Sequence, residues 1–352
     1  MSHVVEHLAE LTGFRDRDTL DVTLVQALQD LLRPRAVAIH RCVGEAAQGQ
    51  HWLTRARLGP GDVIATADPL WSELASLPRV ESTPERFACL SQQEAFCVPG
   101  PPPRAYFPLA TECETVGVLE LESEEPLSTA DIRLVSNILR IYRNFQGLLD
   151  YSERDTLTGL LNRKTFDESF LRICTMPEAA SVPAGAGAGA GAGTAEPRRA
   201  AHATSWWLGV IDIDLFKRVN DTFGHLMGDE VLLLLSRLMR TSFRFHDHLF
   251  RFGGEEFVAL MRCGSEADAA AAFERLRVNV ERYPFPQVGR ITVSVGFTEL
   301  RAGDSPSAAF DRADKAIYYA KQHGRNQVRH HASLVAAGEL TDTSREGDVE
   351  FF

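Results

Sequence analysis

No segment of this sequence is apolar enough to cross a membrane. The densest apolar run covers residues 231–235 and is followed at once by Ser236 and Arg237, whereas a spanning helix needs about 20 apolar residues. The first residues, MSHVVEHLAELTGF, carry His and Glu where a signal peptide has basic and then apolar residues. We therefore expect no membrane partner and a cytoplasmic location.

Basic residues and paired cysteines are also scarce. Lys and Arg number 37 against 48 Asp and Glu, which gives a formal net charge of −11. Because phosphate backbones are bound by clustered positive charge, we expect no nucleic acid polymer as a partner, although a local pocket for one nucleotide stays open. The 6 cysteines form no C-x-x-C pair, so neither a zinc knuckle nor a thioredoxin-like site is predicted.

Low-complexity and acidic segments divide a chain whose composition is otherwise globular. With 352 residues, 44% of them hydrophobic, the chain is long enough for about two domains. Gly–Ala alternation over residues 183–193 offers nothing to bury, so residues 177–204 are predicted to form a flexible insertion. A silk-like strand there would need many stacked copies. Residues 331–352 are predicted to be an acidic disordered tail.

Residues 1–127 have the pattern of an α+β module. Apolar residues recur at helical spacing over residues 19–32, and strands are expected at 36–41, 106–109 and 116–121. Gly117 would permit close packing in the last strand. This order, with FPL followed by VGVLEL, resembles the GAF family of small-molecule sensor domains. The resemblance implies a sensor for an unknown small-molecule or protein signal; a dimerisation module without a ligand is the alternative.

Residues 128–154 are predicted to form a helical signalling stalk. One apolar seam comprises Ile132, Val135, Leu139, Tyr142 and Leu149, interrupted by Gln146. A second stripe comprises Ile138, Ile141, Phe145 and Leu148. A helix with two apolar stripes is either buried or paired with a second copy. We favour a parallel dimer along the first seam, and packing on the preceding module is the alternative.

Residues 155–330 alternate strands and helices, which predicts an α/β domain. Strands are expected at 206–213, 249–252, 257–261 and 291–297, and helices at 229–242, 265–282 and 305–323. Four motifs occur in order within this half: DTLTGLLNR at 155–163, DIDLFKRVND at 212–221, GGEEF at 253–257 and AKQHGRN at 320–326. Together they resemble the GGDEF family of diguanylate cyclases.

That resemblance implies both a fold and an activity. The expected fold is a central sheet flanked by helices, and the expected reaction condenses two GTP into cyclic di-GMP and pyrophosphate by metal-assisted phosphoryl transfer. Because the product is two-fold symmetric, we expect a homodimer in which each subunit presents one GTP to the other. The alternative is a catalytically silent domain that acts as a receptor for GTP or cyclic di-GMP.

Acidic residues occur at a strand end and at a hairpin tip, which is a pattern that favours binding of a cation. Asp212 ends a buried strand, and Glu255 and Glu256 occupy a Gly-rich hairpin tip. Carboxylates that meet at one sheet edge repel each other, and a hard cation such as Mg²⁺ (or Mn²⁺) relieves the repulsion. The resemblance implies that Asp212, Glu255 and the carbonyl of Ile213 ligate the metal. It further implies that Glu256 is another ligand or helps to deprotonate the attacking hydroxyl.

Two single-residue alternatives stay open at this acidic strand end. Asp212 taken alone could be a helix N-cap. Asp214 could equally be a cap or the partner of a nearby cation.

Nucleotide contacts are expected from two other motifs. No Walker loop occurs, and by resemblance Lys321 and Arg325 contact the terminal phosphates instead. Lys217 is a third candidate for the phosphates, and its neighbour Phe216 is placed in the same substrate site. A solvated helix face is the alternative for Lys321.

Base selection is assigned to Asn220 and Asp229. A carboxylate only accepts hydrogen bonds, and guanine presents N1–H and an amino group side by side, whereas adenine presents an acceptor at N1. Asp229 therefore favours guanine. It could also be the N-cap of a helix beginning there.

The tetrapeptide Arg244-Phe245-His246-Asp247 has the R-x-x-D pattern. Its position upstream of GGEEF matches the family's inhibitory product site, which implies that Arg244 and Asp247 bind cyclic di-GMP. An ordinary surface ion pair is the alternative.

Two features of the sequence bear on this resemblance. The signature reads GGEEF, which keeps a carboxylate at its third position with a longer reach, so we expect an active enzyme. The DTLTGLLNR segment, read as a helix, is assigned to structure and signal coupling rather than to chemistry.

Overall fold

The structure is a computed structural model that describes residues 17–44, 49–68, 74–110, 115–175 and 204–341, together with Ala9. The chain divides into two units, with the boundary between Ser152 and Glu153. The predicted Gly–Ala insertion lies outside the described residues as far as position 203, and so does the predicted tail from position 342. Within the described parts of the chain, no helix combines the length and the apolar character that crossing a membrane requires.

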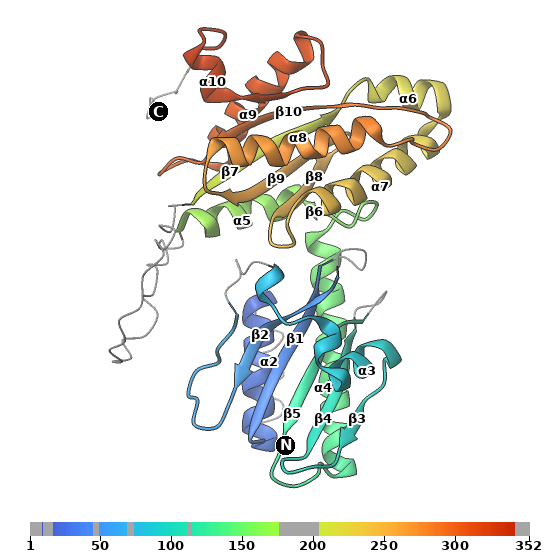
Figure 1. The fold of residues 1–352 in the computed structure, drawn as a ribbon, viewed down its shortest axis with the longest axis vertical. Coiled ribbons are helices and arrows are strands. Elements are labelled where there is room, and N and C mark those ends of the chain that lie inside the picture. The colour runs from blue at the N-terminus through green and yellow to red at the C-terminus, as the bar shows by residue number, and fades with distance from the viewer. Residues whose placement is uncertain are drawn as a thin grey trace, which may run out of the picture. The chain divides into compact units, whose positions relative to one another are not determined.

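The N-terminal unit is built on a five-stranded antiparallel sheet (Figure 1). Its strand order is β2-β1-β5-β4-β3. The strands are β1 (Ala36–Val43), β2 (His51–Leu58), β3 (Phe96–Val98), β4 (Arg104–Ala110) and β5 (Thr115–Glu122). The helices are α2 (Arg17–Leu32), α3 (Pro84–Gln92) and α4 (Thr129–Glu153), with short 3₁₀ turns at Leu74–Ser76 and Val80–Ser82. The predicted α+β order is confirmed.

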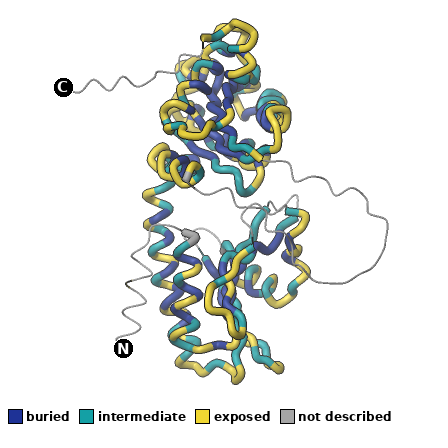
Figure 2. The backbone as a smooth tube through the Cα atoms, turned by 90° about the vertical axis from the view of Figure 1, so that its left-hand side faces the viewer, coloured by how far each residue is buried: buried dark blue, intermediate teal, exposed yellow. Residues whose placement is uncertain are grey.

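The two faces of this sheet carry separate cores. Helices α2 and α4 share one core with alternate residues of β1, β4 and β5. Members of this core include Leu24 of α2, Phe107 of β4 and Leu119 of β5. Trp52 and Cys89 belong to a smaller core on the α3 side. In Figure 2 the buried residues of the helices lie on the side that faces the sheet.

A glycine allows two strands of this sheet to approach closely. A Cβ atom at Gly117 would lie 2.4 Å from the carbonyl oxygen of His40, so no larger residue fits. The close packing predicted for Gly117 is confirmed.

Helix α4 corrects the dimer-seam prediction. Val135, Leu139, Tyr142 and Leu149 of the predicted seam are buried in the core of their own unit. Gln146, which interrupts the seam in sequence, is also buried. This seam is therefore covered by the module's own sheet and by α2. Packing on the preceding module was the alternative interpretation, and the assignment of the seam to a second copy was wrong. In the other stripe, Leu148 keeps 67% of its surface exposed.

A buried polar network fastens α4 to α2 and β1. The Tyr142 hydroxyl donates to Asp21 and accepts from the Gln146 amide at 2.9 Å. One Arg41 guanidinium nitrogen lies 3.0 Å from the same Asp21 carboxylate, and the Arg55 guanidinium lies 3.8 Å from its other oxygen. Burial by itself lowers the pKa of Arg41, but the interactions with Tyr142 and Asp21 raise it overall, so the guanidinium stays charged.

The C-terminal unit contains a six-stranded mixed sheet of order β11-β10-β7-β9-β8-β6. The strands are β6 (Leu161–Asn162), β7 (Ser205–Ile213), β8 (His248–Gly253), β9 (Glu256–Cys263), β10 (Val293–Glu299) and β11 (Val328–His330). The pairs β6–β8 and β10–β11 are parallel, and the other pairs are antiparallel. The helices are α5 (Arg163–Thr175), α6 (Phe216–Phe223), α7 (His225–Ser242), α8 (Glu266–Arg282), α9 (Pro306–Gln322) and α10 (His331–Ala336).

Alternation along the central strand β7 separates two cores. Ile211 and Ile213 point to the core shared with α6, α7 and α8, whereas Leu208 and Val210 point to the core shared with α5 and α9. By this alternation Asp212 faces the α9 side. A Cβ atom at Gly296 of β10 would lie 2.1 Å from the Ala313 carbonyl oxygen of α9, so the helix rests directly on the strand.

Three sequence predictions about this unit were wrong in detail. Residues 155–163 do not form a helix, because a turn and the short strand β6 precede α5, which begins at Arg163. Helix α7 begins at His225 after Gly224, so Asp229 lies inside it and is not its N-cap. Residues 331–336 form helix α10 with His331 and Leu334 buried, so the chain stays folded beyond the predicted start of the tail.

Candidate active site

Asp212 lies at the carboxyl end of β7 with 4% of its surface exposed. Its Oδ1 atom lies 2.9 Å from the Lys321 ammonium, which stands in the last turn of α9. Burial raises the pKa of Asp212; Lys321 opposes the shift, while Glu256 and Asp214 add to it. Lys321 therefore compensates this carboxylate only in part, and the contact brings the fourth motif next to the second.

The GGEE turn brings two more carboxylates to Asp212. Gly253 and Gly254 have φ angles of 150° and 50°, which only glycine adopts readily, and they carry the chain from β8 into β9. Glu256 then pairs with Asp212 across the β7–β9 ladder. Burial and then the Asp212 carboxylate raise the pKa of Glu255. Three acidic side chains thus meet at one sheet edge.

Asp214, two residues further along, has a different role. Its two oxygens accept hydrogen bonds from the Thr292 hydroxyl at 2.6 Å, the Ser294 hydroxyl at 2.7 Å and the Asn326 backbone N–H at 3.0 Å. These donors come from the residue before β10, from β10 itself and from the loop after α9. Asp214 therefore holds the loop of the fourth motif beside β7. Hydroxyl and backbone N–H groups are its partners here, rather than the helix cap or the cation that the sequence left open for it.

The two predicted phosphate-binding residues lie at the end of α9. Lys321 is partly exposed, and Arg325 is exposed with a φ of 60° just after Gly324. The Arg325 backbone N–H donates to the Ala320 carbonyl at 2.9 Å, which closes the turn after the helix. Both cations are thus held on the α9 side of the acidic edge with access to solvent.

The predicted base-binding residues lie in the two helices that flank the α6–α7 turn, Asn220 in α6 and Asp229 in α7. Gly224, with a φ of 84°, separates the two helices. A Cβ atom at Gly228 would lie 2.0 Å from Asn220 Oδ1, so Asn220 lies directly against the first turn of α7, next to exposed Asp229. In α6, Phe216 is 5% exposed and packs in the core, which leaves Lys217 as the exposed neighbour.

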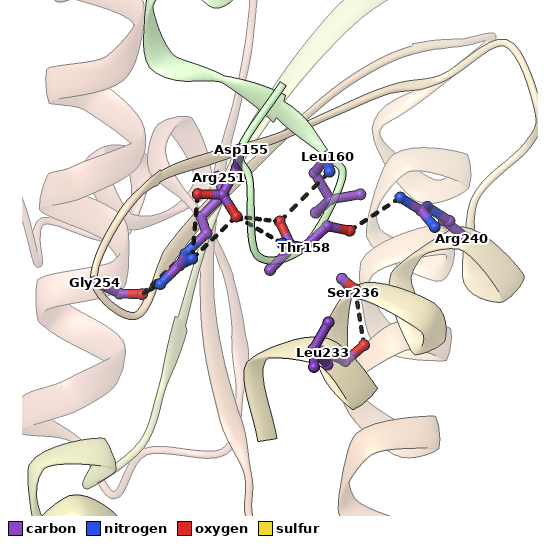
Figure 3. A network of polar contacts seen from close by, with 8 residues as sticks. All are labelled: Asp155, Thr158, Leu160, Leu233, Ser236, Arg240, Arg251 and Gly254. Carbon is purple, nitrogen blue, oxygen red and sulfur yellow. Dashed lines mark hydrogen bonds and ion pairs between the residues drawn. The ribbon is translucent and has the colours of Figure 1, made fainter. Parts of the chain in front are cut away.

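Arg251 is a functional candidate that the sequence interpretation missed. In Figure 3 its guanidinium lies between Asp155 and the hairpin tip. It donates to both Asp155 oxygens at 3.0 and 3.2 Å, and to the Gly254 carbonyl at 3.2 and 2.9 Å. A signal was available, because Arg251 is a charged residue inside the mostly apolar strand HLFRFG.

The first motif forms the turn that holds Asp155 in place. The Thr158 backbone N–H and hydroxyl donate to Asp155 Oδ1 at 2.8 and 2.7 Å. Arg240 of α7 donates to the Thr158 carbonyl at 3.1 Å (Figure 3). The beginning of this unit is thereby fastened to the glycines that precede Glu255.

The R-x-x-D segment forms a tight turn between α7 and β8. Asp247 accepts a hydrogen bond from the Arg244 backbone N–H at 2.8 Å, and its side chain is 4% exposed. Burial raises the pKa of Asp247 to about 6, although Arg244 and Arg275 oppose the shift. The Arg244 side chain is exposed. Asp247 therefore shapes the turn, and Arg244 is the member of the pair that solvent reaches.

The acidic edge has the donor chemistry of a shared cation site. Across the residues that the structure describes, no group of three or more His, Cys, Asp or Glu could hold a metal ion by itself. Asp212 and Glu255 nevertheless carry charge that burial disfavours, and hard oxygen donors of this kind suit Mg²⁺ or Mn²⁺. Because Mg²⁺ is often held by one or two carboxylates plus phosphate oxygens, the residues present fit a cation that arrives with a nucleotide.

Comparisons with known proteins agree on the C-terminal unit. Residues 194–327 match the family described as diguanylate cyclase, GGDEF domain. Diguanylate cyclase DgcM of Escherichia coli strain K12 is 33% identical over 198 residues, which are 55% of this chain and 42% of that protein. Diguanylate cyclase DgcP of Pseudomonas aeruginosa is 44% identical over 124 residues, 34% of this chain and 18% of that protein.

A solved structure is also similar to part of this chain. It is the GGDEF domain of DgcB from Caulobacter crescentus in complex with c-di-GMP, with 32% identity, 51% of this chain and 96% of that chain covered, and a TM-score of 0.42. The chain spans less than half the length of the two curated relatives named above.

Proposed function

We propose that this chain, whose C-terminal unit carries a GGDEF domain, is a diguanylate cyclase that condenses two GTP into cyclic di-GMP and two pyrophosphates. The observation that carries the proposal is the meeting of Asp212, Glu255 and Glu256 at one sheet edge beside Lys321. Phosphoryl transfer needs stabilisation of negative charge and accurate positioning rather than a protein nucleophile. An acidic edge flanked by cations meets both needs.

The carboxylates at this edge would hold the metal. Asp212, Glu255 and the backbone carbonyl of Ile213 would bind Mg²⁺ or Mn²⁺, with Glu256 as a further ligand. When bound, such a cation polarises the α-phosphate and makes the attacking 3′-hydroxyl more acidic. As the alternative to that ligand role, Glu256, which is exposed, would accept the proton from that hydroxyl. In this state Lys321 would exchange its contact with Asp212 for one with the nucleotide.

Cations and amide groups would position the two ends of GTP. Lys321 and Arg325 would contact the terminal phosphates, with Lys217 as an additional cation. Asn220 and Asp229 would pair with the guanine edge, since a carboxylate accepts from N1–H and the amino group together. Adenine offers an acceptor at N1, and burying that mismatch costs about 1–3 kcal/mol, which favours GTP over ATP.

Two finer parts of the proposal concern assembly and regulation. One GTP per subunit would be presented by each partner of a homodimer, because the reaction joins two identical nucleotides. The N-terminal unit would be a GAF-like sensor. Its fold, an antiparallel sheet with α2 and α4 on one face and α3 on the other, supports this assignment.

Cyclic di-GMP would inhibit the enzyme at the R-x-x-D turn. Arg244 would bind a guanine edge and a phosphate of the product, because its guanidinium is exposed and can donate two parallel hydrogen bonds. We expect Arg244→Ala to weaken product binding about tenfold or more without changing the initial rate. Progress curves with added cyclic di-GMP measure this. Equal inhibition of the wild-type protein and of the Arg244→Ala variant would show that this turn is not the product site.

The decisive experiment for the activity uses the purified full chain. With GTP and Mg²⁺ we expect pyrophosphate release and cyclic di-GMP formation in a ratio of two to one. ATP in place of GTP should give no product. Binding of GTP or cyclic di-GMP without turnover would contradict the proposal and support the receptor alternative.

A further inference from the structure

A cavity of the N-terminal unit lies between strand β4 and helix α4. Its volume is about 380 Å³, within the range of about 300–1,000 Å³ that small-molecule sites occupy. Phe107 and Leu109 of β4 and Leu139 of α4 line it with apolar surface. The cavity is therefore large enough for a compact organic molecule and has walls that favour an apolar body.

Two guanidinium groups border the same cavity. Arg140 and Arg143 stand three residues apart on α4, so they project from neighbouring positions of one helix face. Both are exposed, and neither has an ion pair or hydrogen bond with any described residue. Among the described residues that line the cavity, none is acidic. In a chain with a net charge of −11, this concentration of positive charge is a local exception.

We propose that this cavity binds a small amphipathic organic anion. The apolar body lies against Phe107, Leu109 and Leu139, and the carboxylate, sulfonate or phosphate head accepts hydrogen bonds from Arg140 and Arg143. Guanidinium groups bind such heads through parallel N–H donors. The proposal concerns the N-terminal unit alone, so it stands or falls independently of cyclase activity.

The position of the cavity gives its occupant a structural effect. Tyr142 also lines it, and the Tyr142 hydroxyl belongs to the buried network with Asp21 and Gln146. A bound molecule touches β4 on one side and α4 on the other. Binding therefore adds contacts that hold α4 against its sheet, next to the side chain that already fastens this helix to α2.

The test compares two fluorescent probes that differ chiefly in charge. The probes are 8-anilinonaphthalene-1-sulfonate, an aromatic sulfonate, and N-phenyl-1-naphthylamine, its uncharged counterpart. Each is titrated into the full chain and into the double variant R140Q/R143Q. We expect the double variant to bind the sulfonate about ten- to hundredfold more weakly and the neutral probe as before. Arg133→Gln is the matched control, because Arg133 is an exposed arginine of α4 outside the cavity.

A second variant separates the cavity from the rest of the surface. Ser136 is an exposed residue of α4 that lines the cavity, so Ser136→Phe should fill the space and weaken binding of both probes. Unchanged thermal unfolding shows that each variant is folded. Absence of saturable sulfonate binding to the full chain overturns the proposal. Sulfonate binding that none of the cavity variants weakens overturns it as well, since the probe then lies elsewhere.

Discussion

The two units each bury charged side chains, but they treat the charge differently. In the N-terminal unit the Asp21 carboxylate is surrounded by Arg41, Arg55 and the Tyr142 hydroxyl. Among the described residues of the C-terminal unit, Asp212 is paired with one cation, Lys321, while burial and acidic neighbours raise its pKa. The first arrangement is balanced, and the second has an excess of negative charge.

This difference separates a structural network from a reactive one. A buried ion pair with all its partners present holds elements in register, and it gives little reason to expect binding of anything else. Uncompensated buried carboxylates keep a free-energy cost that a cation can remove, so they indicate a site. The contrast recurs within one strand end, where Asp214 is saturated by three donors and Asp212 is not.

The largest expected effect tests the reactive side of the comparison. We expect Asp212→Ala and Glu255→Ala to lower turnover at least about a hundredfold, because a metal ligand contributes several kcal/mol to charge stabilisation. Their thermal stability should be unchanged or raised, since repulsion is relieved. Pyrophosphate release and thermal unfolding measure the two quantities. Asp214→Ala is the matched control and should destabilise the fold. Turnover within about tenfold of wild type in both variants would contradict the assigned roles.

The next effect tests the structural side. Asp21→Ala leaves Arg41 buried without its carboxylate, so we expect a loss of about 3–5 kcal/mol in the free energy of unfolding. Tyr142→Phe removes only the hydroxyl and should cost about 1–2 kcal/mol. Urea unfolding measures the free energy of unfolding, and hydrogen exchange should locate the change in α2 and α4. A destabilisation by Asp21→Ala no larger than that of Tyr142→Phe would mean that Arg41 finds other compensation.

A smaller effect depends on pH. Burial raises the pKa of Asp247 to about 6, although Arg244 and Arg275 act to lower it. The folded state therefore binds a proton at this carboxylate more tightly than the unfolded chain does. Stability from this group is therefore lost as pH rises from about 4 to about 6, and the loss persists above that range. Asp247→Asn keeps an acceptor for the Arg244 N–H. It should raise the free energy of unfolding near pH 8 by at most about 3 kcal/mol, and hardly change it near pH 4.

Thermal unfolding across that pH range measures the effect of Asp247→Asn. His246 lies beside Asp247 at 3.9 Å, and its pKa is lowered to about 4, mainly by burial, so it is neutral near pH 8 in both proteins. A variant that is destabilised equally at both ends of the range would show that the carboxylate is needed only as the acceptor of the turn.

The smallest expected effect concerns positioning of the hairpin. Arg251→Gln removes the link between Asp155 and the Gly254 carbonyl, so the GGEE turn is held less firmly. We expect kcat to fall about tenfold with KM nearly unchanged, the pattern of a lost transition-state contact. Asp155→Asn keeps one acceptor and should have a weaker effect. A rise in KM alone would place Arg251 in substrate binding rather than in positioning.

Motifs explain why much of this site could be predicted. Asp212 at a strand end and Glu255 at a Gly-rich hairpin tip were enough to expect acidic residues at one edge, whereas Lys321 was assigned to the site by the family resemblance alone. Asp214 and Arg251 were not assigned, because their partners lie far away in sequence. For Arg251 the local pattern shows a charge within a strand but does not show what that charge pairs with. Arg251 is 96 positions from Asp155, and only the parallel β6–β8 pairing brings them together.

The predictions of one helix boundary and of one helix partner were wrong, and both errors have a physical reason. Asp229 has the side chain of an N-cap, but Gly224 ends α6 earlier and lets α7 begin at His225. The seam of α4 has a pattern that suits either a second copy or a neighbouring sheet, and apolar periodicity does not distinguish them. A local glycine decided the first case, and tertiary packing decided the second.

The direct contact of α9 with β10 at Gly296 has a genetic consequence. Ala313, whose carbonyl would meet any Cβ at that position, is on the same helix as Lys321, so a methyl group at Gly296 pushes on the support of the ammonium that faces Asp212. If the proposed activity is under selection, we expect that selection to act on Gly296 as well, although it is not among the residues proposed to bind the nucleotide. In a collection of inactive alleles, Gly296→Ala belongs with the substitutions of Lys321, and compensating second-site changes should fall in α9 rather than in the hairpin.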